Sequence, residues 1–483
     1  MTLKANFTHH LARLGIALLI ALVAMCGAKA FAQSTAGANG ANEVGLNAAA
    51  TDKEVSKKGA SENKADSKSE AKTNSAEMAK IIEALEERVR QLEARLAKME
   101  SAQATDVAAA KTTAPAVGKA DEVAEIKKEV AVIQEEAKKN AGFLNFFRDV
   151  EMSGSVDAYY GYNFNHPDNN FNTGRNFDFR HNSFNINYAE VVFEKKNDLK
   201  DRLGFRLDVG FGPTADFVHS ADPAGSEVVK HIQQAYVSYV APVGSGLTVD
   251  FGKFVTPHGA EVIETKDNFN YSRSFLFAYA IPYYHTGMRA KYSFNDKVAL
   301  TGFLVNGWNN FNDNNGGKTY GASLGLTPTK RLSITENYMA GPEQPNDNEH
   351  WRHLTDTVVT YLASDKVTLM GNFDYGKDKL SNGATAYWTG FAGYLRYAFT
   401  NRLAFAPRFE IFDDHDGFTT GLAQTLKSLT LTQEVKLSNK LLTRFEFRRD
   451  YSDKEFFSKS FGRAVKNQNT LLIGFSYAFS TRE

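Results

Sequence analysis

From about Val150 onward, apolar and polar residues alternate in segments of roughly ten residues. In one segment the apolar positions are Leu203, Phe205, Leu207, Val209 and Phe211, and the positions between them are Arg202, Gly204, Arg206, Asp208 and Gly210. A period of two places successive side chains on opposite faces of a strand. The pattern therefore predicts strands with two unlike faces, although a soluble sandwich would alternate in the same way.

The connections between these segments alternate in length. Short polar turns are expected at 197–201, 242–246, 295–296, 327–330, 363–365, 400–401 and 438–439. Longer loops rich in Asn, Asp and Gly are expected around 163–182, 212–228, 255–283, 307–317, 340–350, 376–387, 412–422 and 450–467. Short turns at one rim and long loops at the other are typical of outer-membrane barrels. The connections join about 16 antiparallel strands into an all-β transmembrane barrel, wide enough to leave an aqueous lumen.

Strands that enter the short turns repeatedly end in aromatic residues. These residues are Tyr239, Tyr292, Phe294, Tyr361, Tyr397, Phe399, Tyr477 and Phe479. A ring of amphipathic aromatic side chains at one depth is favoured by the headgroup boundary of a bilayer. A soluble protein has no reason to place them at one depth, so this feature favours the membrane barrel.

The stretch "NYSRSFLFAYAIPYYHTGMRA" (residues 270–290) contains an uncharged, mostly apolar run that is too short to span a bilayer as a helix. We expect it to divide in two. Asn270 to Ile281 closes the long third loop as a short helix or turn, and Pro282 ends it. From Tyr283 a strand begins, with Arg289 and Lys291 turned to water.

The N-terminal third of the chain differs in composition from the rest, because it has no Phe, Tyr or Trp between Gln33 and Gly142. Residues 1–32 read as a secretory signal, with a basic start, an apolar core and a small-x-small cleavage site at Ala30-Phe31-Ala32. An uncleaved membrane anchor would need a longer apolar segment. Residues 33–76 have no periodic apolar pattern and are predicted to be a disordered linker.

Residues 77–101 carry a heptad pattern. Met78, Ile82, Leu85, Val89, Leu92, Leu96 and Met99 are spaced alternately four and three apart. This spacing predicts a short coiled coil, and a single solvated helix with internal ion pairs is the alternative. Residues 102–142 form a linker with one short helix, and residues 143–483 form the barrel.

Charge and cysteine content exclude several classes of function. The 56 basic and 56 acidic residues balance, and removal of the signal leaves three more acidic than basic residues. This balance argues against nucleic acid as a partner. The single cysteine, Cys26, lies in the signal, so the mature chain has no thiol chemistry. The acidic segments 413–416 and 312–317 lack full calcium-ligand spacing, so we expect neither a metal nor a cofactor.

Three stretches resemble a known family of outer-membrane proteins. They are "VEMSGSVDAYYGYNFN" (150–165), "FDFRHNSFNINYAEVVFEK" (177–195) and, most specifically, "GKFVTPHGAEVIETKDNFNYSRSFLFAYAIPYYHTGMRAKYSFND" (252–296). They are similar to the β-barrel porins called OmpL-like, and the resemblance covers most of residues 150–483. It implies an outer-membrane diffusion channel, and it carries over few individual functional residues.

The alternation also assigns charged residues to the inner face of the barrel. The predicted pore-lining set is Arg206, Asp208, Arg289, Lys291, Arg396, Arg408, Glu410, Arg444, Glu446 and Arg448. On a lipid face each charge would cost about 2–4 kcal/mol at mid-depth. Such residues either provide a polar lining for solutes or form ion pairs within the wall. Basic residues outnumber acidic ones in the set, which hints at a weak preference for anions.

The third loop is the longest and is expected to be functional. Its candidate residues are His258, Glu261, Glu264, Lys266, Asp267 and Arg273. We expect the loop to enter the lumen as a constriction, with Glu261, Glu264, Asp267 and Arg273 facing the pathway. Packing on the rim or against a neighbouring subunit is the alternative.

The sequence therefore predicts a porin in the cell outer membrane, with outer-membrane lipid around it and small hydrophilic solutes or ions passing through it. A homo-oligomer such as a trimer is expected, with the N-terminal segment in the periplasm. An alternative function is a structural tether from the outer membrane to the cell wall, which would involve peptidoglycan or another periplasmic component. A barrel enzyme is a further alternative, although no spacing here demands a catalytic Ser/His pair.

Overall fold

The computed structural model of the protein describes residues 149–220, 222 and 229–481. The predicted signal, linkers, coiled coil and short helix of residues 1–142 lie outside these residues. Their place in the chain stays a prediction.

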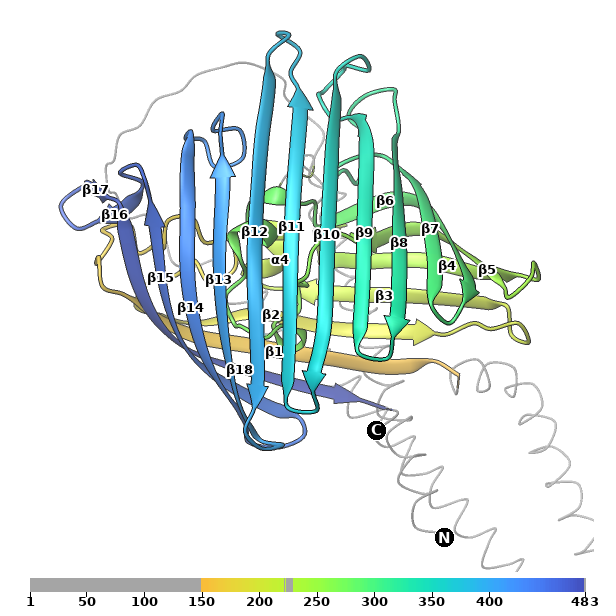
Figure 1. Cartoon of the computed structure of the whole chain (residues 1–483), viewed down its shortest axis with the longest axis horizontal. Coiled ribbons are helices and arrows are strands. Elements are labelled where there is room, and N and C mark those ends of the chain that lie inside the picture. The colour runs from red at the N-terminus through yellow and green to blue at the C-terminus, as the bar shows by residue number, and fades with distance from the viewer. Residues whose placement is uncertain (1–148, 221, 223–228, 482–483) are drawn as a thin grey trace, which may run out of the picture. The chain divides into compact units, whose positions relative to one another are not determined.

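The described chain forms one closed antiparallel barrel (Figure 1). Its strands are β1 (Glu151–Asn163), β2 (Ser183–Lys195), β3 (Leu203–Phe211), β4 (Ile232–Ala241), β5 (Leu247–Val255), β6 (Tyr284–Asn295), β7 (Val298–Val305), β8 (Thr319–Thr329), β9 (Leu332–Pro342), β10 (Trp351–Ser364), β11 (Val367–Lys379), β12 (Thr385–Ala398), β13 (Leu403–Asp414), β14 (Gln424–Lys436), β15 (Leu441–Ser452) and β18 (Asn467–Ser480). The prediction of 16 strands is confirmed.

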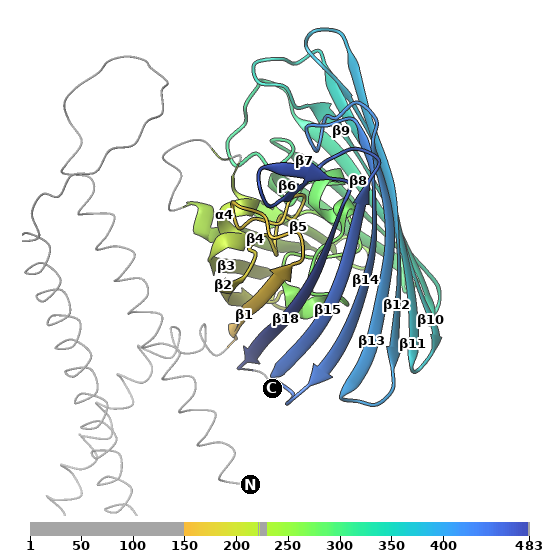
Figure 2. The same cartoon turned by 90° about the vertical axis from the view of Figure 1, so that its left-hand side faces the viewer.

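The barrel closes where its first and last strands meet. β1 pairs with β2 on one side and with β18 on the other, where Ser153 lies opposite Ser480 and Gly161 opposite Leu472. The two strands lie side by side in Figure 2. Closure leaves no free sheet edge, so the backbone N–H and C=O groups of every strand can pair within the wall. Because an even number of strands runs alternately up and down, and a long loop follows β1, the chain both enters and leaves the barrel at the rim of the short turns.

All seven short turns and seven of the eight long loops occur where the sequence predicts them, within a few residues. One difference concerns the loop expected at 376–387. β11 continues to Lys379 and β12 begins at Thr385, so only five residues connect them. The ladder continues because Lys377 pairs with Tyr387, and Tyr375 packs against the Tyr387 ring with their centroids 6.4 Å apart.

Two long loops contain secondary structure of their own. The second loop holds the helix α4 (Pro213–Val218) and a 3-10 turn, η1 (Val229–His231). The last loop holds a two-stranded hairpin, β16 (Phe457–Lys459) and β17 (Arg463–Val465). No helix among the described residues is long and apolar enough to cross a membrane.

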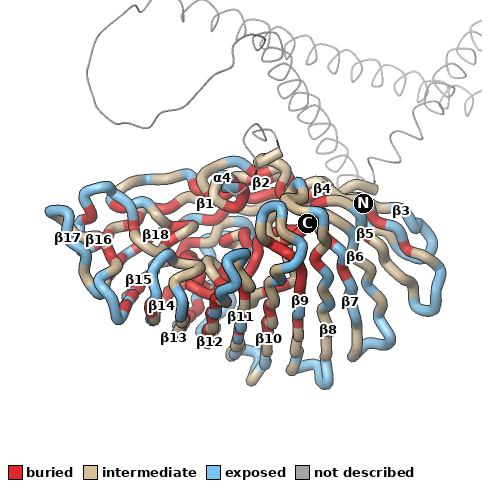
Figure 3. The backbone as a smooth tube through the Cα atoms, turned by 90° about the horizontal axis from the view of Figure 1, so that it is seen from above, coloured by how far each residue is buried: buried red, intermediate tan, exposed pale blue. Residues whose placement is uncertain are grey.

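Many polar side chains of the strands are buried and many apolar ones are exposed, which is the reverse of a soluble barrel. Seen from above, buried positions alternate along the strands with exposed ones, and many gather inside the barrel (Figure 3). On β13 to β15 the buried residues are mostly polar, whereas Phe409, Leu429 and Phe445 are 53%, 42% and 50% exposed. An apolar outer face around a polar interior is the arrangement that a lipid solvent selects.

Aromatic residues surround the outer face at both rims. Tyr239, Tyr361 and Tyr477 near the short turns are exposed, as the sequence predicts. Near the long loops, Tyr320 and Trp351 are also exposed, and their rings stack with centroids 6.4 Å apart. The sequence analysis did not predict this second set, because its members do not share one position relative to an easily recognised turn.

Candidate functional site

The third loop connects β5 to β6 over residues 256–283 and contains two short helical turns. The first is η2 (Thr265–Asp267) and the second is a single π-helical turn, η3 (Leu276–Ala280). The predicted short helix or turn within Asn270 to Ile281 is thus confirmed. β6 begins at Tyr284, one residue after its predicted start.

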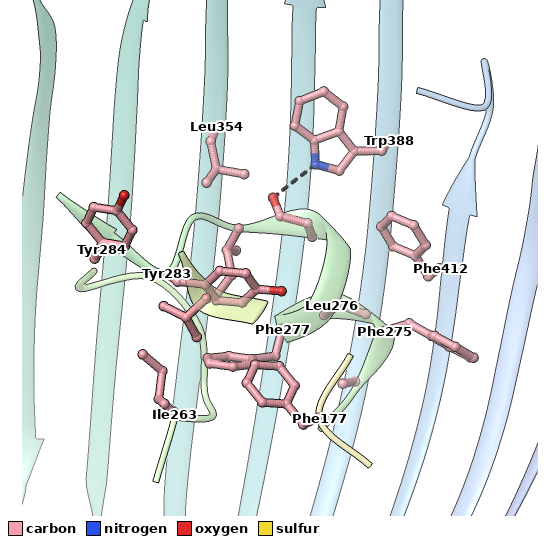
Figure 4. Packing of buried hydrophobic residues seen from close by; sticks show 14 of the residues in the cluster. Phe177, Ile263, Phe275, Leu276, Phe277, Tyr283, Tyr284, Leu354, Trp388 and Phe412 are labelled. Atoms are coloured by element: carbon pink, nitrogen blue, oxygen red, sulfur yellow. Dashed lines mark hydrogen bonds between the residues drawn. The ribbon is translucent and has the colours of Figure 1, made fainter. Parts of the chain in front are cut away.

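The apolar half of the loop packs against the inner wall (Figure 4). Phe275, Leu276 and Phe277 are buried in one cluster with Trp388 of β12 and Phe412 of β13. The indole N–H of Trp388 donates a hydrogen bond to the carbonyl oxygen of Ala280 at 3.1 Å. The run that is too apolar for an exposed loop is therefore the face with which the loop contacts the barrel.

Carboxylates of the wall bind the backbone of the loop. Glu446 of β15 accepts hydrogen bonds from the backbone N–H of Tyr271 at 2.7 Å and from that of Ser272 at 3.0 Å. Glu410 of β13 accepts one from the backbone N–H of Phe275 at 2.5 Å. A turn without regular strand pairing leaves such donors unpaired, and the two carboxylates satisfy them.

Arginines of the wall bind loop carbonyl groups in the same region. Arg408 donates to the Ser272 carbonyl oxygen at 2.6 Å and forms an ion pair with Glu261 of the loop at 2.7 Å. Arg444 donates to the Thr265 carbonyl oxygen at 2.8 Å. Arg448 donates to the carbonyl oxygen of Arg273 at 2.5 Å. Wall and loop thus exchange charge-assisted hydrogen bonds in both directions.

This arrangement corrects one expectation about the predicted pore-lining set. Arg408, Glu410, Arg444, Glu446 and Arg448 do point into the barrel, but the loop covers them and they are buried. Alternation along a strand fixes the face on which a side chain lies and does not reveal what covers that face. These five residues hold the loop and are not open to water.

The loop also contacts strands on both sides of this cluster. Asp157 of β1 accepts a hydrogen bond from the Tyr271 hydroxyl at 2.9 Å. Asp356 of β10 accepts one from the backbone N–H of Gly259 at 3.0 Å, and Asn372 of β11 accepts one from that of Ala260 at 3.2 Å. The sequence analysis missed these three wall residues. Each of them occupies an inward position of an alternating strand, and this position could have identified them as candidates.

The remaining pore-lining candidates keep some exposure. Arg206 pairs with Asp208 at 2.9 Å, and Asp208 itself is buried. Arg289 pairs with Asp250 at 2.7 Å, and the Arg289 side chain is 25% exposed. Two further cations also remain accessible: Arg396, which is bound to Glu434 at 2.5 Å, and the exposed Lys291.

The charged candidates within the loop separate into two groups. Glu261 and Arg273 are buried, which corrects the expectation that they face the pathway: Glu261 pairs with Arg408, and Arg273 donates to the Tyr271 carbonyl oxygen. Glu264 and Lys266 are partly exposed and Asp267 is exposed.

His258 is buried beside His285. Burial, and after it the neighbouring His285, holds the pKa of His258 well below its usual range, so the imidazole is neutral near pH 7.

The described residues contain no group of three or more His, Cys, Asp or Glu side chains that could hold a metal ion. In the two acidic loop segments the carboxylates have other partners. Asp414 accepts hydrogen bonds from the backbone N–H groups of Thr419 and Thr420, and Asp313 pairs with Lys318. Both segments thus satisfy their acids through turn hydrogen bonds and an ion pair.

Replacement of Arg408 by Gln should release the loop. The change leaves the Glu261 carboxylate buried without its cation, and breaking a buried pair costs about 3–5 kcal/mol. We expect faster hydrogen exchange of the backbone amides of residues 259–275, measured by mass spectrometry on the folded protein in detergent. Arg396→Gln is the matched control, because Arg396 pairs with Glu434 of the wall and not with a loop residue, so exchange in the loop should change much less than in Arg408→Gln. Equal protection in both variants would contradict the anchoring role of Arg408.

A second variant, Gly474→Ala, tests how closely the loop packs against β18 and leaves every charge unchanged. A Cβ atom at Gly474 of β18 would lie 2.2 Å from the ring of the buried Tyr271, so Gly474→Ala should displace this part of the loop. At Gly302 of β7 a Cβ atom has no neighbour within 4 Å, which makes Gly302→Ala the control. We expect faster amide exchange at residues 265–273 only in Gly474→Ala.

Two solved structures of outer-membrane proteins are among those similar to this chain. The anion-selective porin from Comamonas acidovorans is 10% identical to this chain, with a TM-score of 0.48 and coverage of 68% of this chain and 99% of that one. The outer membrane channel DcaP of Acinetobacter baumannii is 13% identical, with a TM-score of 0.46 and coverage of 68% and 97%. None of the curated proteins compared with the chain matches it.

A family model covers nearly the whole barrel. It matches residues 149–479, from the residue just before β1 almost to the end of β18, and its description is "Putative beta-barrel porin-2, OmpL-like". The resemblance found in the sequence is thereby confirmed. The chain belongs to this family of OmpL-like β-barrel porins, which are proteins of the outer membrane.

Proposed function

We propose that the protein is a water-filled channel for the passive diffusion of small hydrophilic solutes or ions, and that its third loop narrows the passage. The observation that carries this proposal is the binding of the loop inside the barrel by Arg408, Glu410 and Glu446. A barrel of sixteen strands is wide enough for an aqueous lumen. A loop fixed within it reduces the free cross-section.

The passage would run between the loop and the strands that the loop leaves uncovered. On that side Arg206, Arg289 and Lys291 keep part of their surface accessible. Near the short turns, a hollow of about 600 Å³ is lined by Asn197, Lys200, Thr248, Lys291 and Ser293, among others. Open space beside polar and charged side chains supports diffusion of hydrated solutes.

The charge of the passage favours anions weakly. Of the ten predicted lining residues, those that stay accessible are Arg206, Arg289, Lys291 and Arg396, which are all basic. Three of them have acidic partners in the wall, which reduces their net field. In the loop, the exposed Asp267 forms an ion pair with Lys266 at 2.5 Å, so it opposes these cations only weakly. We propose a modest selectivity.

The positions of the short turns indicate which rim of the barrel faces the periplasm. Short turns face the periplasm in outer-membrane barrels, and β1 begins at that rim. We therefore assign the N-terminal segment to the periplasm, where the predicted coiled coil would assemble a homo-oligomer. Membership of a porin family supports transport over enzymatic activity. Binding of the coiled coil to peptidoglycan stays a prediction, since residues 77–101 lie outside the described chain.

Removal of the loop tests its role as a constriction. We expect that replacing residues 261–273 by a short Gly–Ser linker raises single-channel conductance in a planar bilayer, because the wall charges beneath it become solvated and the lumen widens. The wild-type chain and Gly302→Ala serve as controls. A folded deletion variant with unchanged conductance would contradict the constriction, and a wild-type protein without any conductance would contradict the channel.

Selectivity provides a separate measurement. Arg289→Gln combined with Lys291→Gln should lower the chloride-to-potassium permeability ratio, obtained from the reversal potential in a salt gradient, by about twofold. Lys330→Gln combined with Arg331→Gln removes the same charges from a short turn outside the lumen and should have a smaller effect. A ratio that rises in the first variant would exclude the proposed route past β6.

A further inference from the structure

Two cations interrupt the apolar outer face of the barrel. On β14 the outward positions from the short-turn end are Val435, Gln433, Leu431, Leu429 and Lys427. On β15 they are Leu441, Thr443, Phe445, Phe447, Arg449 and Tyr451. Lys427 and Arg449 are both exposed. Each strand therefore changes from apolar to cationic as it approaches the long loops.

The pairing register brings the two cations together. Lys427 lies opposite Tyr451, and Leu429 lies opposite Arg449, so the cations are diagonal neighbours on one face. Diagonal neighbours in an antiparallel pair are about 7–8 Å apart. Arg449 donates a hydrogen bond to the Asn469 side-chain oxygen at 3.2 Å, which leaves the rest of its guanidinium accessible.

Neither cation forms an ion pair with any residue that the structure describes. Two carboxylates lie beside Lys427 on its long-loop side. Asp453 accepts a hydrogen bond from the backbone N–H of Thr425 at 2.8 Å and pairs with Lys454 at 3.6 Å. Asp413 of β13 lies two residues beyond the Ile411 that is opposite Lys427. Asp413 instead accepts a hydrogen bond from the Thr425 hydroxyl at 2.8 Å. The two positive charges are therefore available to an external anion.

The depth of the cations matches the edge of a hydrocarbon layer. Each is three residues from the long-loop end of its strand, which corresponds to about 10 Å along the strand. Exposed Leu429 and Phe445 lie on the short-turn side of them, and Tyr451 lies on the other side. Aromatic residues with a polar group and cations with long stems are suited to this boundary, where charges cost little.

A hairpin adds cationic and aromatic groups at the same end. In Figures 1 and 3, β16 and β17 extend sideways beyond β15. Lys459 pairs with Arg463 at the base of its turn. Phe461 in the turn is 87% exposed and has a φ of 65°, a conformation that is unusual for a bulky residue. The hairpin thus places an exposed aromatic ring at the long-loop end of the barrel.

We propose that Lys427 and Arg449, with Tyr451 beside them, bind a phosphate group of an anionic glycolipid in the outer leaflet. The outward face of the wall meets lipid, and the long loops lie at the outer rim, so the headgroup layer is the occupant that the position selects. Guanidinium and ammonium groups at this spacing match phosphate oxygens. The inference concerns the outer face and does not depend on the channel proposal.

The test uses the full chain in detergent and bisphosphorylated lipid A as the probe. Native mass spectrometry measures the lipid bound per chain for the wild type and for Lys427→Gln combined with Arg449→Gln. We expect affinity to fall by about tenfold, since each cation near an anionic headgroup contributes to binding. Lipid A without phosphates should bind wild type and variant equally, and inorganic phosphate should not compete at millimolar concentration.

Two control variants make the outcome decisive. Lys330→Gln combined with Arg331→Gln removes one Lys and one Arg at the opposite rim and should bind like wild type. Lys427→Arg combined with Arg449→Lys keeps both charges and should retain binding within about threefold. Unchanged lipid affinity in the Gln variant, or an equal loss in the rim control, would overturn the proposal. A changed oligomeric mass without a change in bound lipid would assign the patch to a second copy of the chain.

Discussion

The structure depends on the need to pair every backbone N–H and C=O group of a chain that crosses lipid. An open sheet would leave two edges unpaired in hydrocarbon, at a cost of several kcal/mol for each group. The pairing of β1 with β18 removes both edges. Once the ladder is closed, the alternation of side chains between lipid and lumen follows from the geometry of each strand.

Closure creates a second problem, because a barrel of this size cannot be filled by the side chains of its own wall. The third loop fills part of the space, and it does so with complementary groups. Carboxylates of the wall bind its amide groups, arginines bind its carbonyl groups, and the apolar turn at Leu276 packs against Trp388. The loop and the wall thus satisfy each other, which explains why buried charges are tolerated at Arg408 and Glu410.

The outer face is subject to a different constraint. Apolar side chains are favoured at mid-depth, whereas aromatic and cationic groups are tolerated toward the rims. Tyr239 near one rim and Tyr320 near the other follow this rule. Lys427 and Arg449 follow the same change from apolar to polar side chains toward the rim. Because they are diagonal neighbours, they give the long-loop rim a pair of cations on its lipid-facing surface.

The sequence alone determined the number of strands, the order of turns and loops, and the face on which each side chain lies, because these depend on local periodicity and turn composition. It also predicted that Asn270 to Ile281 would form a compact turn ended by Pro282. It did not determine that Arg408, Arg444 and Arg448 would be covered while Arg289 stayed accessible. That distinction depends on contacts between residues more than a hundred positions apart, and only the closed tertiary structure brings them together.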